Sequence, residues 1–70
     1  MNYEILANAI VEQAAKDYRW ARTALAKDPE NGSAAQMRSD TERFFRSAWF
    51  GQLTSIDGEW LLEKLEGEFA

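Results

Sequence analysis

The segment Lys27-Asp28-Pro29-Glu30-Asn31-Gly32-Ser33 decides the fold that this sequence predicts. It concentrates turn-forming residues, and Pro29 biases Asp28 away from helical backbone angles. The chain on either side holds no other proline, and the stretch before it holds no glycine. We therefore expect two helices that meet at this segment in a tight hairpin.

The first helix is predicted to run from about residue 2 to residue 27. This stretch contains seven alanines, and its charged residues are scattered at helical spacing. On a helical wheel one broad stripe is apolar, and we expect it to face the core. The stripe consists of Tyr3, Leu6, Ala7, Ile10, Val11, Ala14, Tyr18, Ala21 and Leu25.

The second helix is predicted from about residue 33 to residue 49. Ser39 and Glu42 have the spacing of a capping box, which would break the helix at Ser39, but we favour a continuous helix. Gly51 is expected to end it, as glycine commonly does. Its inner face is predicted to comprise Ala34, Met37, Thr41, Phe44, Phe45 and Ala48.

The third helix is predicted from about residue 55 to residue 68. Thr54 and Asp57 are candidates for its N-terminal cap. Its inner face is expected to present Leu61, Leu62, Leu65 and Phe69. Residues 1–70 therefore read as one all-α domain, a small three-helix bundle or an open three-helix unit with a long first helix.

The composition argues against most enzyme chemistry. The 70 residues include no cysteine and no histidine, so neither a disulfide, nor the usual zinc ligands, nor a Ser-His or Cys-His nucleophile is available. Four glutamates near the C-terminus would lie on the outer face of a helix, where a solvated charged face is expected. They are Glu59, Glu63, Glu66 and Glu68. We expect a non-enzyme without metal or cofactor, stabilised by self-association.

The charge pattern limits the partners that the chain could bind. A net charge of −4 and a pI near 4.6 argue against binding to duplex nucleic acid, which depends on basic patches. The apolar fraction of 46% is too high for a disordered chain. The longest apolar runs are too short for a signal peptide or a membrane span, so we expect a cytoplasmic protein without a membrane partner.

The segment from Arg38 to Phe50 is the densest mixture of arginine and aromatic residues in this acidic chain. Arginine side chains can hold phosphates while aromatic rings stack on bases, so a nucleotide site is one hypothesis. The alternative is a salt-bridged helix face, because two of the arginines lie four residues from Glu42. The candidate ligand-binding residues are Arg38, Arg43, Arg46, Trp49 and Phe50.

A second set of apolar residues falls outside the predicted inner stripes. Clusters of exposed tryptophan and aliphatic side chains usually mark contacts. Either the third helix covers these residues within one chain, or they meet copies of themselves in a homo-oligomer, which we favour slightly. The candidate interface residues are Ile5, Trp20, Leu53, Ile56 and Trp60.

The sequence also resembles a family of small helical proteins encoded by phages, prophages and other mobile elements of Gram-positive bacteria. The resemblance covers most of the chain. It rests on Lys16-Asp17-Tyr18-Arg19, on Glu42-Arg43-Phe44-Phe45-Arg46-Ser47 with Trp49-Phe50, and on Leu53-Thr54 with Asp57-Gly58-Glu59.

This resemblance implies a counter-defence role inside a host bacterial cell. One version is an oligomer that sequesters a signalling nucleotide between subunits, at Arg38, Arg43, Arg46 and Trp49. Another is an acidic helical inhibitor that masks a host protein. A third is a regulatory or assembly factor that acts through helix-in-groove contact.

Overall fold

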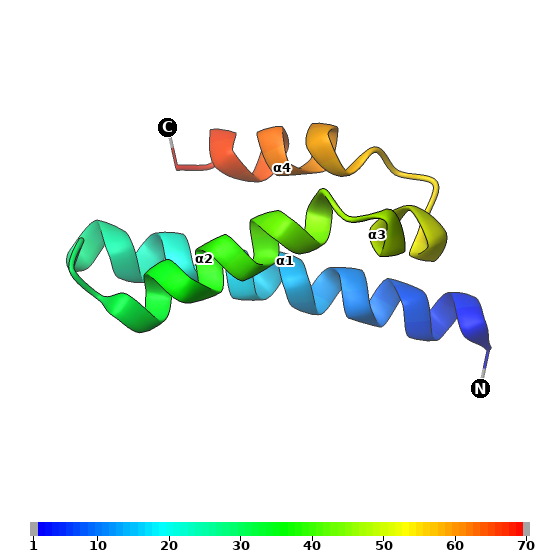
Figure 1. Cartoon of the computed structure of the whole chain (residues 1–70), viewed down its shortest axis with the longest axis horizontal. Helices are drawn as coiled ribbons and strands as arrows, with labels where there is room; N and C mark the ends of the chain where they lie inside the picture. The colour runs from blue at the N-terminus through cyan, green and yellow to red at the C-terminus, as the bar shows by residue number, and fades with distance from the viewer. Residues whose placement is uncertain (1, 70) are drawn as a thin grey trace.

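A computed structural model describes residues 2 to 69, which form four helices. They are α1 (Tyr3–Lys27), α2 (Gly32–Phe45), α3 (Ala48–Leu53) and α4 (Gly58–Gly67). In Figure 1, α1 and α2 form an antiparallel hairpin, and α4 runs back along them in the direction of α1. The predicted all-α class and the long first helix are confirmed.

The hairpin forms at the segment that the sequence indicated. Asp28 leaves the helical conformation at the end of α1, with φ −143° and ψ 96°. Its carboxylate accepts a hydrogen bond from the Glu30 amide at 3.0 Å. Asn31 then caps α2, because its side chain accepts a hydrogen bond from the Ala34 amide at 3.0 Å. The turn therefore satisfies the backbone groups at both helix ends locally.

The second predicted helix is divided, so the expectation of a continuous helix to Trp49 is wrong. It remains unbroken at Ser39 but ends at Phe45. The Ser47 hydroxyl donates to the Phe44 carbonyl at 2.7 Å and accepts from the Phe50 amide at 3.2 Å, which caps α3. Gly51 lies inside α3 and does not end a helix. A serine that bonds both neighbouring turns lets the chain change direction.

The last helix begins three residues later than predicted. Asp57 caps α4 through the Glu59 amide at 3.0 Å, whereas the Thr54 hydroxyl accepts from the Ile56 amide within the preceding loop. Gly58 is buried where α4 passes the end of α2. A Cβ atom at this position would overlap the Phe45 carbonyl oxygen, so only glycine permits this approach.

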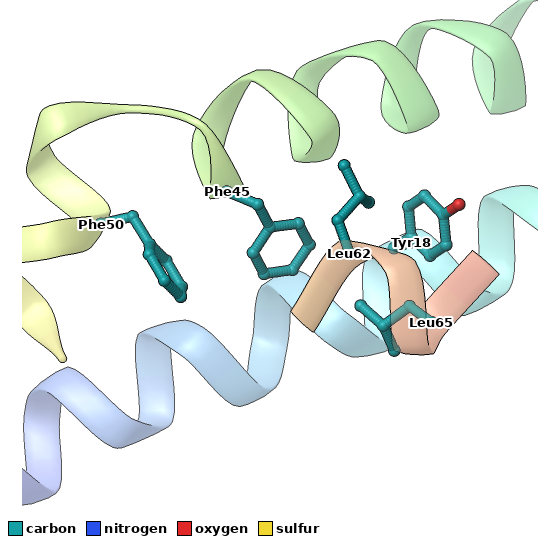
Figure 2. Close-up of a cluster of buried hydrophobic side chains, with 5 residues drawn as sticks. All are labelled: Tyr18, Phe45, Phe50, Leu62 and Leu65. Carbon is teal, nitrogen blue, oxygen red and sulfur yellow. The ribbon is translucent and has the colours of Figure 1, made fainter. Parts of the chain in front are cut away.

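The core lies between the α1–α2 hairpin and the two shorter helices. Figure 2 shows its five largest buried side chains together: Tyr18, Phe45, Phe50, Leu62 and Leu65. The rings of Phe45 and Phe50 meet nearly edge to face, with centroids 5.6 Å apart at 78°, a geometry that aromatic pairs prefer. The change of direction at Ser47 brings Phe50 into this cluster.

Two arginines of α1 hold the C-terminal end of α4. Arg19 forms a bidentate pair with Glu68 at 2.9 and 3.0 Å. Arg22 donates to the Tyr18 hydroxyl at 2.6 Å, and its guanidinium lies 5.2 Å from the centroid of the Phe69 ring. The buried tyrosine hydroxyl is therefore hydrogen bonded, as a buried polar group requires.

Candidate interaction site

The arginines of the Arg38 to Phe50 segment are engaged with carboxylates. Arg38 lies 3.8 Å from Glu42 on the same helix. Arg46 pairs with Glu59 of α4 at 2.7 Å. Hydrogen bonding to Glu59, with the attraction of its charge, raises the pKa of Arg46. The Arg38–Glu42 contact is the one that a salt-bridged helix face predicts, whereas Arg46 pairs with Glu59 on another helix and not with Glu42.

The five candidate ligand-binding residues do not converge on one pocket. Arg43 faces Asp40 at 4.0 Å, and it shares a shallow polar hollow of about 420 Å³ with Arg46 and Glu42. Phe50 is buried in the core. Trp49 instead packs edge to face on Phe44, with centroids 5.5 Å apart. Of the five, only Arg43 and Arg46 are therefore brought together in one hollow, which Glu42 also lines.

The candidate interface residues also occupy different places. Ile5, Trp20, Ile56 and Trp60 are exposed, while Leu53 is buried within the chain. Ile5 and Trp20 are separated by about 22 Å along α1, given the rise of 1.5 Å per helical residue. Trp60 lies on α4, where the Lys64 ammonium sits 5.7 Å from its ring centroid. The five candidate interface residues therefore do not form a single continuous patch.

An apolar groove lies between α1 and α2. It has a volume of about 360 Å³, and its exposed lining is almost entirely apolar. We call it the α1–α2 groove, lined by Ile10, Gln13, Ala14, Asp17, Met37, Asp40, Thr41 and Phe44. The sequence analysis placed most of these residues on inner faces, but no α4 residue lines the groove.

The length of the helices explains why the groove is open. Ten residues of α4 span about 15 Å, whereas the 25 residues of α1 span about 37 Å. The short helix covers one side of the hairpin, through Leu62 and Leu65. The apolar stripe on α1 is too broad for α4 to cover, so its other side stays accessible. The ratio of these lengths indicates from the sequence that α4 leaves part of the hairpin uncovered, but it does not indicate which side.

Exposed apolar side chains extend the groove at one end. Tyr3 and Leu6 precede Ile10 by seven and four residues, so the three lie on the same stripe of α1. Tyr3 is 61% exposed and Leu6 is 45% exposed, although both were predicted to face the core. Trp49 adjoins the same end through its contact with Phe44. The accessible apolar surface is therefore longer than the groove itself.

Each wall of the groove carries one aspartate. Asp17 on α1 accepts a hydrogen bond from Gln13 at 2.9 Å, and Asp40 on α2 accepts one from Gln36 at 2.8 Å. Both glutamine–aspartate pairs are spaced i, i+4, which orients each carboxylate along its own helix. Among the groove-lining residues these are the only two charged side chains. The groove thus has an apolar floor and an acidic rim.

Other kinds of site find little support in residues 2 to 69. This part of the chain contains no group of three or more side chains suited to hold a metal ion. None of its helices is both long and apolar enough to cross a membrane. Comparison with protein families, curated proteins and solved structures gives no significant match.

Proposed function

We propose that this chain is a non-catalytic interaction module that accommodates a helical segment of another protein in the α1–α2 groove. The observation that carries the proposal is the combination of an almost wholly apolar lining with exposed Tyr3, Leu6 and Trp49 at one end. Helix-in-groove binding uses apolar anchors at the same 3–4 residue spacing that α1 presents. This corresponds to the regulatory or inhibitory alternatives of the sequence analysis.

The alternative function, sequestration of a signalling nucleotide, has weaker support. Arg38 and Arg46 each face a carboxylate, and these contacts compete with a phosphate. Trp49 packs against Phe44, a residue that lines the groove, and not beside the arginines in their hollow. A nucleotide site would need a second subunit to complete it, so it stays a prediction together with the homo-oligomer. The resemblance to phage and mobile-element proteins suggests that the partner is a host protein.

Site-specific photo-crosslinking in the cell that carries the chain tests the proposal. A photoreactive residue at Gln13, on the groove wall, should crosslink to one defined protein, whereas the same residue at the exposed Thr23 should not. Ile10→Lys should abolish the crosslink because it places a charge over the apolar floor. Ile5→Lys is the matched control, since Ile5 is an isoleucine of the same helix outside the groove.

Thermal shift with a panel of nucleotides separates the two functions. A ligand that binds only the folded state raises the melting temperature, by an amount that grows with the logarithm of ligand concentration over Kd. We expect no nucleotide to raise it for the wild-type chain. Two results together would favour the nucleotide function over the groove. One is a large rise in melting temperature that Arg43→Ala and Arg46→Ala abolish together, and the other is the absence of the crosslink at Gln13.

A further inference from the structure

The acidic rim distinguishes the α1–α2 groove from a purely apolar surface. Asp17 and Asp40 belong to opposite walls, and both line the groove over its apolar floor. Both carboxylates are held by glutamine side chains. The one arginine near them, Arg43, is 77% exposed and lies 4.0 Å from Asp40. At that distance and exposure the pair is weak, so the rim keeps its negative character.

The chain as a whole reinforces this local charge. Its formal net charge is −4 at pH 7. Of the four remaining arginines, 19, 38 and 46 are paired with carboxylates, and Arg22 is hydrogen bonded to the Tyr18 hydroxyl. An approaching cationic segment is therefore attracted at long range and then meets two carboxylates at the groove. An anionic segment would meet repulsion at both steps.

The charges also argue against a second copy of this chain as the occupant. A two-fold dimer uses the same patch on both subunits. Seating the groove on its own copy would bring two Asp17 and two Asp40 carboxylates into one partly desolvated interface. Like charges in such an environment repel strongly. The copy would supply no cation from its own groove lining, because that lining contains none.

The size of the apolar surface limits the length of the occupant. Exposed or groove-lining residues follow one another along α1 at spacings of three and four residues, from Tyr3 to Asp17. That stretch of helix is about 21 Å long, which accommodates about four turns of a second helix. Helices pack on such stripes by fitting side chains between those of the partner.

Resting on the proposed function, we infer that the groove's partner segment is a cationic amphipathic helix of about four turns. Its apolar residues pack on Ile10, Met37 and Phe44, and its lysine or arginine side chains flank them and pair with Asp17 and Asp40. The two aspartates therefore select the charge of the partner, while the apolar floor supplies most of the contact area.

Two designed helical peptides of about four turns test this inference. Both carry leucines alternately three and four residues apart, and one has lysine and the other glutamate at every flanking position. Binding is followed by fluorescence anisotropy of the labelled peptide. We expect the lysine peptide to bind and the glutamate peptide not to bind. The affinity for the lysine peptide should fall as salt is raised, since salt screens exposed charges.

Variants of equal charge locate the effect. The double variant Asp17→Asn, Asp40→Asn keeps both oxygen acceptors for the glutamines. It should lower the affinity for the lysine peptide by about tenfold. Glu12→Gln with Glu63→Gln removes the same charge from exposed positions outside the groove and should change the affinity less than about twofold. Ile10→Lys should abolish binding, and Ile5→Lys should not. Circular dichroism checks that each variant is folded.

The possible results distinguish helix docking in the groove from the selection of a cationic partner by the two aspartates. Equal, salt-independent binding of both peptides, lost in Ile10→Lys, would overturn the charge selection and leave helix docking intact. An equal loss of affinity for the lysine peptide in the groove double variant and in the Glu12→Gln, Glu63→Gln double variant would also overturn the charge selection. Absence of binding by either peptide, together with no crosslink at Gln13, would overturn the groove function itself. A dimer that Ile10→Lys dissociates would make the second copy the occupant.

Discussion

Gly58 lies where the first turn of α4 passes closest to the last turn of α2. The space that a side chain would need is occupied by the Phe45 carbonyl and by the Phe50 ring. This contact sets the distance between the two helices and therefore the position of Leu62 and Leu65 in the core. The residue is notable because its role depends on a tertiary contact and not on a left-handed backbone conformation.

Substituting Gly58 with alanine should destabilise the fold. The added Cβ would force the two backbones apart, and overpacking of this kind costs about 3 kcal/mol. For a domain of this size the melting temperature should fall by roughly 15 °C. Gly51→Ala is the control, since a Cβ there meets nothing within 4 Å and alanine is the better helix former. Equal stability of the two variants would contradict the close approach.

The Arg19–Glu68 pair should make stability depend on pH in the acid range. The hydrogen bonds from Arg19 lower the pKa of Glu68 from its ordinary value of 4.5. A lowered pKa in the folded state means that the contribution is complete above the unfolded value and is lost as pH falls through the folded value. Glu68→Gln should therefore be less stable than wild type at neutral pH.

Urea unfolding at a series of pH values measures this difference. The gap between wild type and Glu68→Gln should be constant near neutral pH and should close as the pH drops below about 4.5, the ordinary glutamate value. Glu63→Gln serves as the control at an exposed glutamate. A gap that persists at the lowest pH would show that the glutamine variant loses packing and not an ionic contact.

At the scale of the elements, Ser47 determines where one helix becomes two. Ser47→Ala removes both the hydrogen bond to the Phe44 carbonyl and the acceptor for the Phe50 amide. We expect a loss of about 1 kcal/mol, which is typical of an N-cap. Ser39→Ala, in the unbroken part of α2, should be neutral or slightly stabilising. Chemical denaturation compares the two variants, and equal effects would contradict the capping role.

The helices differ in how well the sequence predicts them. α1 and the hairpin were predictable because proline, asparagine and a long periodic stripe are local signals. The break at Ser47 was not, because no proline or glycine stands between Phe45 and Phe50. Ser47 caps this break, and the burial of Phe50 in one cluster with Phe45 and Leu62, which lie on other helices, stabilises the change of direction. The prediction that Gly51 ends the second helix was wrong because glycine ends a helix only when the backbone requires it.

The site was predictable only in its components. Sequence reasoning identified the arginine and aromatic residues but could not determine that Glu59, from a distant helix, pairs with Arg46. It placed Ile10, Met37 and Phe44 on inner faces, and these residues do face one another. Whether a third helix covers them depends on the side of the hairpin on which α4 packs. Only the tertiary structure determines on which side α4 packs, so the groove could not be predicted from the sequence.

At the scale of the whole molecule, the chain exposes a large surface for its mass. Its accessible area is 4829 Å², compared with about 4,450 Å² expected for a monomeric protein of 8.0 kDa. Trp20, Trp49 and Trp60 are 51, 53 and 52% exposed. A chain of this size without a disulfide has few other sources of stability, so these surfaces are natural contact sites.

Tryptophan emission should therefore report self-association. In the dilute protein all three indoles are half exposed, so we expect emission close to that of exposed tryptophan. The homo-oligomer predicted from the sequence would bury Trp20 and Trp60, neither of which lines the groove. As the protein is concentrated, emission should shift to shorter wavelength in step with the mass measured by light scattering. Trp49→Phe should retain this shift, while Trp20→Phe with Trp60→Phe should lose it.

A mass that stays at one chain would show the oligomer prediction to be wrong, and a rising mass with unchanged emission would assign association to another surface.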